Sequence, residues 1–253
     1  MNIKSIISGN PTFTKTVPEG VPFLNIAEFF YDTIQGENFV GWPAAFLRLQ
    51  GCTLCCSWCD TKEVWRFGNP YTYDELFELI DKTDLVKKLE LGQHLILTGG
   101  SPLKQEKAVL GFIDEFQERY GFLPYIEIEN ESTRMPSPEM VKIISCWNNS
   151  PKLSHSGNAD SHRYKPEVLR FLSGLENSWF KFVVSKEEDW QEIKRDFIDT
   201  GLILRDQIVL MPLGATRAEL FENREYVAEI AVRETVRYAT REHIVLWDKK
   251  VGV

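Results

Sequence analysis

Four of the five cysteines in the chain, Cys52, Cys55, Cys56 and Cys59, stand within one short segment, and only Cys146 lies elsewhere. Disulfide bonds that stabilise a fold usually join separated elements by closing long loops. A tight group of thiols instead favours metal binding or redox chemistry. This segment is therefore the first candidate for a functional site.

Cys52, Cys56 and Cys59 have the spacing Cys-x3-Cys-x2-Cys. A [4Fe–4S] cluster normally takes four thiolates, so three of them leave one iron open to a further ligand. The amino and carboxylate groups of S-adenosylmethionine can chelate that iron, and an electron from the cluster can then break a carbon–sulfur bond of the cofactor. The product is a 5′-deoxyadenosyl radical that abstracts hydrogen from unactivated carbon. The spacing thus predicts a radical enzyme.

Cys55 permits a second interpretation, in which two Cys-x2-Cys pairs hold zinc. Zinc ribbons and fingers separate such pairs by about a dozen residues or more, so that two knuckles can face each other. Here the two pairs are adjacent. We therefore favour the cluster over zinc binding or thiol redox chemistry, and we interpret Cys55 and Cys146 as small core or surface residues.

Apolar runs rich in β-branched and aromatic residues predict the strands that position this segment, and amphipathic stretches predict helices between them. The predicted strands are 45–49, 95–98, 125–129, 179–184, 208–211 and 244–247. The predicted helices are 73–89, 107–120, 138–147, 187–198 and 217–238. Thr72 and Glu75 have the spacing of a capping box at the start of the first helix.

The alternation of strands and helices predicts an α/β fold with a mostly parallel sheet, either open or curled into a barrel. Ligand sites in such sheets lie at the carboxyl ends of the strands. Residues 51–61 follow the first predicted strand, 98–102 the second and 129–133 the third. We therefore expect these three segments to converge on one site.

The composition predicts a single domain over residues 1–253. Of the 253 residues 43% are hydrophobic, which is enough for one sizeable core. Residues 1–15 lack the pattern of a secretory signal and no apolar run has the length of a membrane span, so we expect a cytoplasmic protein without membrane contact. A net charge of −8 opposes binding to phosphate backbones, which argues against a nucleic-acid partner and for a small-molecule substrate.

Three segments carry a family resemblance. They are Thr33-Ile34-Gln35-Gly36-Glu37, Phe46-Leu47-Arg48-Leu49-Gln50-Gly51-Cys52 and Trp58-Cys59-Asp60-Thr61. Together they resemble the radical S-adenosylmethionine superfamily and, within it, the 7-carboxy-7-deazaguanine synthases of queuosine biosynthesis. The resemblance spans most of the chain and is densest over 29–61. Weaker likenesses are Thr98-Gly99-Gly100, Ser150-Pro151-Lys152, Met211-Pro212 and the ending from Leu246-Trp247 to Gly252-Val253.

The resemblance implies a specific reaction. Members of that family convert 6-carboxy-5,6,7,8-tetrahydropterin to 7-carboxy-7-deazaguanine with loss of ammonia, using S-adenosylmethionine and Mg²⁺. The implied fold is an incomplete (β/α)6-type barrel in a homodimer, and the implied electron donor is a reductant such as flavodoxin or ferredoxin.

On the substrate side, the resemblance implies contacts from Ile34, Gln35, Gly36, Arg48 and Thr98. A Gln-Gly pair after an apolar run is otherwise an ordinary turn. Arg48 interrupts an apolar strand, where an unpaired cation is costly to bury. It either faces solvent or acts as a guanidinium fork that grips the substrate carboxylate, and we favour the fork.

On the cofactor side, the resemblance implies a larger set of contacts. The residues it assigns to S-adenosylmethionine are Trp58, Cys59, Asp60, Gly100, Glu129, Ser150, Pro151, Lys152, Met211 and Pro212. It assigns the Thr61 hydroxyl to Mg²⁺, although a threonine there could simply cap a turn, and Glu129 could equally face solvent. Two positions depart from the family: Ser101 replaces the glutamate of Gly-Gly-Glu-Pro, and Ser132 replaces the glycine of Glu-Thr-x-Gly-Thr.

Two other functions compete. A glycyl-radical activase shares the cysteine spacing but does not require Arg48 or Gln35-Gly36-Glu37. A non-catalytic iron–sulfur carrier or sensor would want a fourth cysteine, for which Cys146 is the only distant candidate. None of the four histidines has a ligand pattern, so we assign none of them to a metal.

Overall fold

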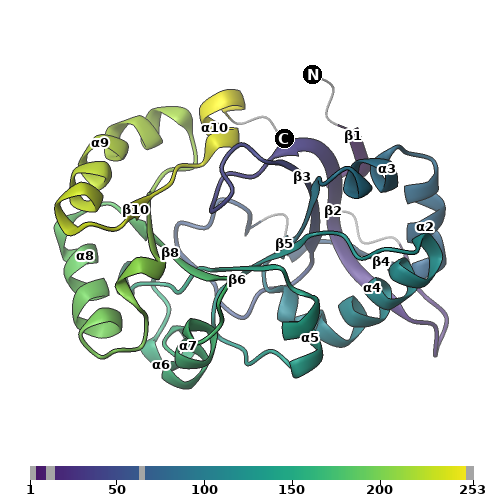
Figure 1. The fold of residues 1–253 in the computed structure, drawn as a ribbon, viewed down its shortest axis with the longest axis horizontal. Coiled ribbons are helices and arrows are strands. Elements are labelled where there is room, and N and C mark those ends of the chain that lie inside the picture. Colours follow the sequence, from purple (N-terminus) through teal and green to yellow (C-terminus); the bar gives the residue numbers. More distant parts are fainter. Residues whose placement is uncertain (1–3, 10–14, 63–65, 249–253) are drawn as a thin grey trace.

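The computed structural model describes residues 4–9, 15–62 and 66–248. Its strands form one ten-stranded sheet in the order β1-β2-β3-β5-β6-β7-β8-β9-β10, with β4 paired to β2 (Figure 1). The strands are β1 Lys4–Ile7, β2 Phe23–Ile34, β3 Pro43–Leu49, β4 Asn69–Thr72, β5 His94–Gly99, β6 Ile126–Asn130, β7 Cys146–Asn149, β8 Ser178–Val184, β9 Ile208–Pro212 and β10 Arg237–Tyr238.

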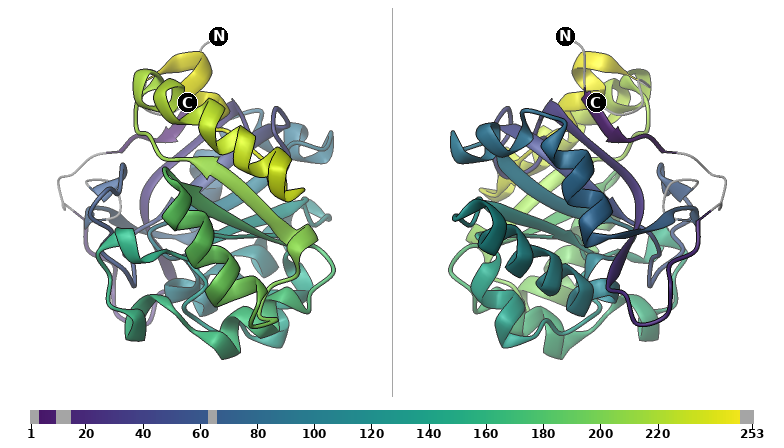
Figure 2. Two further views of the ribbon diagram at one scale, coloured as in Figure 1. Left: turned by 90° about the vertical axis from the view of Figure 1, so that its left-hand side faces the viewer. Right: turned by 90° about the vertical axis from the view of Figure 1, so that its right-hand side faces the viewer.

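Most helices lie along the outer side of the curved sheet, whereas the last helix contacts β2 and the helix before it (Figure 1). The helices are α2 Tyr73–Asp81, α3 Leu85–Glu90, α4 Glu106–Tyr120, α5 Pro138–Ile143, α6 Asp160–Arg163, α7 Pro166–Ser173, α8 Glu187–Ile193, α9 Arg217–Glu234 and α10 Glu242–Trp247. The side views in Figure 2 show helices of the N-terminal half covering one flank and helices of the C-terminal half the other. No helix among the described residues is long and apolar enough to cross a membrane.

Neighbouring strands from β3 to β10 are parallel, whereas β2 is antiparallel to β1, β3 and β4. The predicted α/β fold with a mostly parallel sheet is therefore confirmed. The long strand β2 was missed, because most of its side chains are buried and the sequence shows no clean alternation of apolar and polar residues.

Alternate residues of each strand face opposite sides of the sheet. Leu47, Leu97 and Ile128 face the helices and belong to one hydrophobic core, which Phe112 and Phe116 of α4 also join. The residues between them, such as Arg48 and Thr98, face the inner side. The sheet therefore has an apolar outer face that holds the fold together and a polar inner face available for chemistry.

Most predicted elements are confirmed, including the capping box, in which Glu75 N–H donates to Thr72 Oγ1 at 3.2 Å and Thr72 N–H to Glu75 Oε2 at 3.0 Å. The predicted helix 73–89 is two helices, however. The Thr83 hydroxyl donates to the Ile80 carbonyl at 2.6 Å and accepts from Leu85 N–H at 3.2 Å. A side chain that bonds the backbone in this way competes with continuous helix.

Two further boundaries and one element type were wrong. The predicted helix 138–147 ends at Ile143, and Cys146–Asn149 is the buried strand β7. The predicted helix 217–238 ends at Glu234, because Thr235 has a left-handed backbone with φ of 55°, and β10 follows. The predicted strand 244–247 is helix α10. Short apolar runs fit a strand or a buried helical turn equally well, so periodicity could not separate them.

Candidate active site

A cavity of about 560 Å³ opens at the carboxyl ends of the parallel strands, where the three predicted segments meet. Predicted site residues that line it are Gln35, Gly36, Arg48, Cys52, Cys56, Trp58, Cys59, Asp60, Thr61, Thr98, Gly100, Glu129, Ser150, Lys152, Met211 and Pro212. Ile34, the last residue of β2, and Pro151, buried after β7, are not among the described residues that line it.

The cysteines divide into two kinds within the loop 51–61, here called the cysteine loop. Cys52, Cys56 and Cys59 line the cavity, whereas Cys55 is exposed. This division fits a [4Fe–4S] cluster, because three thiols from one loop face the same space. Among the described residues no three His, Cys, Asp or Glu side chains are grouped for a single metal ion. Cysteines that hold a cluster bind different irons, so they need no such grouping.

Burial raises the pKa of the Cys52 thiol to about 11 and also raises the pKa of Cys56. Both thiols are therefore protonated near neutral pH in the metal-free protein, and iron binding must release their protons. Cys146, the first residue of β7, is buried, and burial raises the pKa of its thiol to about 12. Of the two placements that the sequence allowed, core or surface, it has the first.

Gly99 and Gly100 let the end of β5 approach the cysteine loop very closely. A Cβ on Gly99 would lie 2.2 Å from the Leu49 carbonyl oxygen, and a Cβ on Gly100 would lie 2.2 Å from the Gly51 oxygen. The Cys52 thiol donates to the Gly100 carbonyl at 3.3 Å. These glycines therefore allow the ends of β3 and β5 to pack closely together, in addition to any contact that they make with a ligand.

Glu131 ties three loops of the site together. One of its carboxylate oxygens, Oε1, accepts hydrogen bonds from the hydroxyls of Thr53 at 2.6 Å, Ser101 at 2.7 Å and Thr133 at 2.7 Å. Thr53 belongs to the cysteine loop, and Ser101 is the residue that replaces the family glutamate. Ser101, which lacks the carboxylate of the family motif, thus contacts the carboxylate of Glu131, the residue that follows β6.

Ser132 keeps the backbone conformation that a glycine would adopt. Its φ is 62°, in the left-handed region, and its N–H donates to Asn130 Oδ1 at 2.8 Å. Non-glycine residues adopt this conformation infrequently. The second departure from the family motif therefore changes the side chain while the turn is retained.

Arg48 lies between Glu28 and Thr98 in the register of the sheet. Its Nε donates to Glu28 Oε1 at 2.7 Å, and Thr98 Oγ1 donates to Glu129 Oε2 at 2.6 Å. Burial raises the pKa of Glu129, an effect that the Thr98 hydroxyl and the Arg48 charge partly offset. Arg48, Thr98 and Glu129, from three neighbouring strands, thus line the cavity side by side, and Glu28 of β2 holds Arg48 from the adjacent strand.

Gln35 is held on both sides. Its Nε2 donates to Glu127 Oε2 at 3.1 Å, and its Oε1 accepts from Gly36 N–H at 2.8 Å. Glu127 is fully buried and also bonds His94 Nδ1 at 2.6 Å and Asn148 Nδ2 at 2.6 Å. A polar network under the cavity floor therefore sets the position of the Gln35-Gly36 pair.

Glu37 forms an ion pair with Lys181 of β8, and its buried Oε2 has no hydrogen-bond partner among the described residues. Burial, with the nearby Arg241 cation, lowers the pKa of Lys181 to about 7. Sequence reasoning missed Lys181, because it lies in an ordinary alternating strand. Only the pairing of β8 within the sheet brings it to the cavity.

Asp60 pairs with Arg241, which joins the cysteine loop to the segment before α10. Burial alone would raise the pKa of Asp60, but the Arg241 guanidinium more than offsets this and holds it below the usual value. Thr61 Oγ1 lies 3.7 Å from Cys59 Sγ and faces the same cavity. The loop therefore presents oxygen donors directly beside its last cysteine.

The C-terminal segment supplies two cavity residues that were missed, Arg241 and His243. A Cβ on Gly36 would lie 3.2 Å from the Glu242 nitrogen, so this segment packs directly on the Gln-Gly pair. Burial and the surrounding cations, Arg241 first among them, lower the pKa of His243 to about 3, which makes it a neutral imidazole near pH 7. Both residues were missed because a strand was predicted at 244–247, where the structure has helix α10.

Trp58 is flanked by residues that follow β7. Its ring stacks on His155 with centroids 5.5 Å apart, and Lys152 Nζ lies 5.9 Å from its ring centroid. Lys152 Nζ also donates to the Ser150 carbonyl at 2.8 Å and to Ser150 Oγ at 2.6 Å. Trp58, Ser150 and Lys152 therefore share one wall of the cavity.

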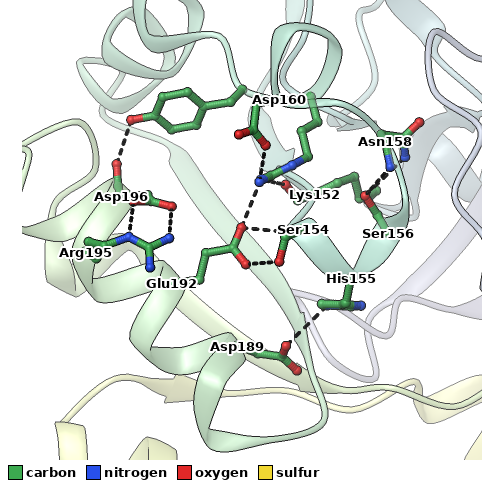
Figure 3. Close-up of polar contacts among 12 residues, drawn as sticks. Lys152, Ser154, His155, Ser156, Asn158, Asp160, Asp189, Glu192, Arg195 and Asp196 are labelled. Carbon is green, nitrogen blue, oxygen red and sulfur yellow. Dashed lines mark hydrogen bonds and ion pairs between the residues drawn. The ribbon is translucent and has the colours of Figure 1, made fainter.

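Residues 152–163, here called the support segment, carry a dense polar network (Figure 3). Arg163 is 5% exposed and donates to the Lys152 carbonyl at 2.8 Å, while it pairs with Asp160 at 2.5 Å and with Glu192 at 3.0 Å. Glu192 in turn accepts from Ser154 N–H at 2.8 Å and from Ser154 Oγ at 2.5 Å. The network fixes this segment against α8.

Comparison with known proteins extends these observations. Residues 35–129 match the family model described as a 4Fe-4S single cluster domain. The chain is 32% identical over 232 residues to a 7-carboxy-7-deazaguanine synthase of Pyrobaculum aerophilum, a match that covers 91% of this chain and 98% of the relative. It is 30% identical to one of Halobacterium salinarum, over 90% of this chain and 91% of that relative. The crystal structure of QueE from Escherichia coli has a similar fold, with a TM-score of 0.60 and 22% identity over 86% of this chain and 93% of that one.

Proposed function

Because the chain belongs to the 7-carboxy-7-deazaguanine synthase family, we propose that it converts 6-carboxy-5,6,7,8-tetrahydropterin to 7-carboxy-7-deazaguanine with loss of ammonia. It does so as a radical S-adenosylmethionine enzyme. The observation that carries the proposal is that Cys52, Cys56 and Cys59 line one cavity together with Arg48, while Cys55 is exposed and is not part of the described lining. A cluster and a carboxylate-bearing substrate can therefore share that cavity.

The three cavity-facing cysteines would hold the [4Fe–4S] cluster. When bound, the cluster supplies the electron that cleaves S-adenosylmethionine. The wall beside it would receive that cofactor through Trp58, Asp60, Ser150 and Lys152. The remaining proposed contacts are Cys59, Gly100, Glu129, Pro151, Met211 and Pro212, of which only Pro151 lies away from the described cavity lining.

The substrate would lie against β3 and β5, with its carboxylate on Arg48. Arg48 Nε donates its hydrogen bond to Glu28. Among the described residues, no hydrogen bond involves the two terminal nitrogens of the Arg48 guanidinium. An end-on pair of N–H groups therefore remains for a carboxylate. Thr98 would contact the substrate from the next strand. Gln35 and Gly36 would contact the edge of the pterin. The hydrogen bond from Gly36 N–H to Gln35 Oε1 holds this pair in position. Ile34, which precedes the pair, would add a further contact to the substrate.

Mg²⁺ would bind at Thr61. Magnesium prefers oxygen ligands and often keeps waters or shares substrate oxygens, so one protein hydroxyl beside the cavity can anchor it. The position of Thr61, next to Cys59 and on the cavity lining, supports this assignment, because its hydroxyl could hold an ion at the cavity that the substrate would share.

The proposal also covers the domain organisation, the cellular location and the partners of the protein. We take residues 1–253 as one domain with an incomplete (β/α)6-type barrel, for which the continuous core from Ile7 to Ala231 gives support. The enzyme would act in the cytoplasm as a homodimer on a small pterin, without nucleic acid or membrane, and receive electrons from a flavodoxin or ferredoxin.

Anaerobic reconstitution with iron and sulfide tests the proposal. The loaded protein is incubated with S-adenosylmethionine, dithionite, Mg²⁺ and 6-carboxytetrahydropterin, and the products are identified by mass spectrometry. We expect 7-carboxy-7-deazaguanine. Formation of 5′-deoxyadenosine without this product would indicate another radical reaction, such as that of an activase. Absence of 5′-deoxyadenosine would indicate a non-catalytic iron–sulfur protein.

A further inference from the structure

Asn158 of the support segment contacts two successive residues of the cysteine loop. Its Nδ2 donates to Cys56 Sγ at 3.3 Å, and its Oδ1 accepts from Cys55 N–H at 2.9 Å. The Cys55 N–H requires an acceptor, so the amide oxygen must face it and the amide nitrogen must face the sulfur. The orientation of this side chain is therefore determined by the chain itself.

The support segment holds Asn158 in place. Asn158 Nδ2 also lies 3.2 Å from Ser156 Oγ, and Asn158 N–H donates to the same oxygen at 3.4 Å (Figure 3). Ser156 is fully buried, and its carbonyl accepts from Ser57 N–H at 2.9 Å. Two connections, one through Ser57 and one through Asn158, thus join the support segment to the cysteine loop.

Among the described residues, Cys56 is the one cavity-facing cysteine whose sulfur receives a side-chain amide. Cys52 Sγ faces the Gly100 carbonyl and the Leu54 N–H, and Cys59 Sγ faces the Thr61 hydroxyl. A hydrogen bond to a ligand sulfur stabilises the extra negative charge that the cluster gains on reduction, and such bonds are among the main determinants of reduction potential.

We propose that Asn158 raises the reduction potential of the cluster by donating a hydrogen bond to the thiolate of Cys56. This inference rests on the proposed function only in that Cys56 holds a cluster iron. Asn158 is a positioning and tuning residue that acts through Cys56. The polar network around Arg163 contributes indirectly, because it keeps the support segment against the loop.

Two substitutions separate the electronic role from a structural one. Asn158→Asp keeps an oxygen for the Cys55 N–H but replaces the donor by an acceptor that repels the thiolate. Asn158→Ala removes both groups. The control is Ser161→Asp, which adds the same charge at an exposed position of α6, outside the described hydrogen bonds that join the support segment to the cysteine loop. Each protein is reconstituted anaerobically, and iron, sulfide and the circular dichroism of the apo form are measured.

The midpoint potential is then determined by redox titration followed by electron paramagnetic resonance, with S-adenosylmethionine and substrate absent. We expect full iron content and a more negative potential in Asn158→Ala, a still more negative potential in Asn158→Asp, and an unchanged potential in Ser161→Asp. Potentials equal to wild type in both Asn158 variants would overturn the proposal. Loss of iron from both variants with the apo fold intact would also overturn it, because Asn158 would then only shape the loop.

The titration needs no substrate turnover. A wild-type protein that binds its cluster but fails to make 7-carboxy-7-deazaguanine would disprove the proposed function and leave this inference testable. A wild-type protein that binds no cluster would disprove both, and iron analysis reports that before any titration begins.

Discussion

Glu28 Oε1 accepts a hydrogen bond from Arg48 Nε at 2.7 Å, and the two residues face each other in the antiparallel register of β2 and β3. Burial alone lowers the pKa of Arg48, but the Glu28 carboxylate more than offsets this, so the pKa lies above its usual value. Glu28 thereby orients the guanidinium as well as compensating its charge. The strand that sequence reasoning missed supplies this partner.

Arg48→Lys is expected to weaken substrate binding. A single ammonium can pair with Glu28 or with the substrate carboxylate, but it cannot present two parallel N–H groups to either. Loss of a charge-assisted pair of about 1.5–3 kcal/mol corresponds to an affinity for 6-carboxytetrahydropterin that is about 10- to 100-fold lower. Equilibrium dialysis measures the affinity, and iron content and substrate-free cleavage of S-adenosylmethionine should stay near wild type. Unchanged affinity would refute the role of Arg48.

Cys52→Ala, Cys56→Ala and Cys59→Ala are each expected to abolish the cluster absorption and all cleavage of S-adenosylmethionine. Cys55→Ala is the matched control and should retain both, because Cys55 contacts Asn158 through its backbone N–H, which the substitution keeps, and its side chain is exposed. Absorption spectra and iron analysis after reconstitution decide the outcome. Iron loss confined to Cys55→Ala would show that the ligands are wrongly assigned.

Thr61→Ala is expected to reduce turnover and to diminish its dependence on magnesium, since a hard oxygen donor is lost while water and substrate still offer others. Thr61→Ser keeps the hydroxyl and should behave like wild type. Rates measured across a magnesium titration test this. Identical magnesium curves for wild type and Thr61→Ala would disprove the metal assignment.

Glu131→Ala is expected to destabilise the metal-free protein by about 2–4 kcal/mol, because three hydroxyls lose their shared acceptor in a mostly buried setting. Thr53 and Thr133 also lie 2.8 Å from each other, which limits the loss. Glu131→Gln keeps a carbonyl oxygen and should cost less. Urea unfolding of the apo forms measures both changes. A free energy of unfolding equal to wild type in Glu131→Ala would contradict the structural role.

The folded protein should lose stability as the pH falls below about 6.5, in part because of His243, whose pKa is lowered from 6.5 to about 3. Between these values the unfolded chain binds a proton that the native protein does not, so the free energy of unfolding decreases as the pH falls. One such group contributes up to about 1.4 kcal/mol for each pH unit. His243→Gln should show a shallower slope in urea unfolding of the apo protein from pH 7 to pH 4. Parallel slopes would exclude His243 as a source.

Local patterns predicted the elements on which the site stands. The spacing of Cys52, Cys56 and Cys59 indicated cluster chemistry, because ligands within one loop are fixed by the loop's own length. The strands β3, β5 and β6 and the helix α4 followed from apolar periodicity, which depends on neighbours along the chain. The convergence of residues 51–61, 98–102 and 129–133 followed in turn from the order of parallel strands.

The residues that were missed depend on contacts between distant parts of the chain. Lys181 reaches Glu37 across 144 positions, and Thr53 reaches Glu131 across 78. Asn158 reaches Cys56 across 102 positions, from a polar segment in which nothing marks one asparagine as special. No local rule connects residues so far apart.

By itself, the sequence determined which residues could hold a cluster and which strands must carry them, since both are properties of short segments. The tertiary structure decided how those residues are oriented and charged. Glu28 orients Arg48, Glu131 joins the loops around Ser101, and Asn158 reaches the sulfur of Cys56. The physical reason is that hydrogen bonds and burial act over a few ångströms in space, whatever the separation along the chain, and only the packed sheet brings these groups within that range.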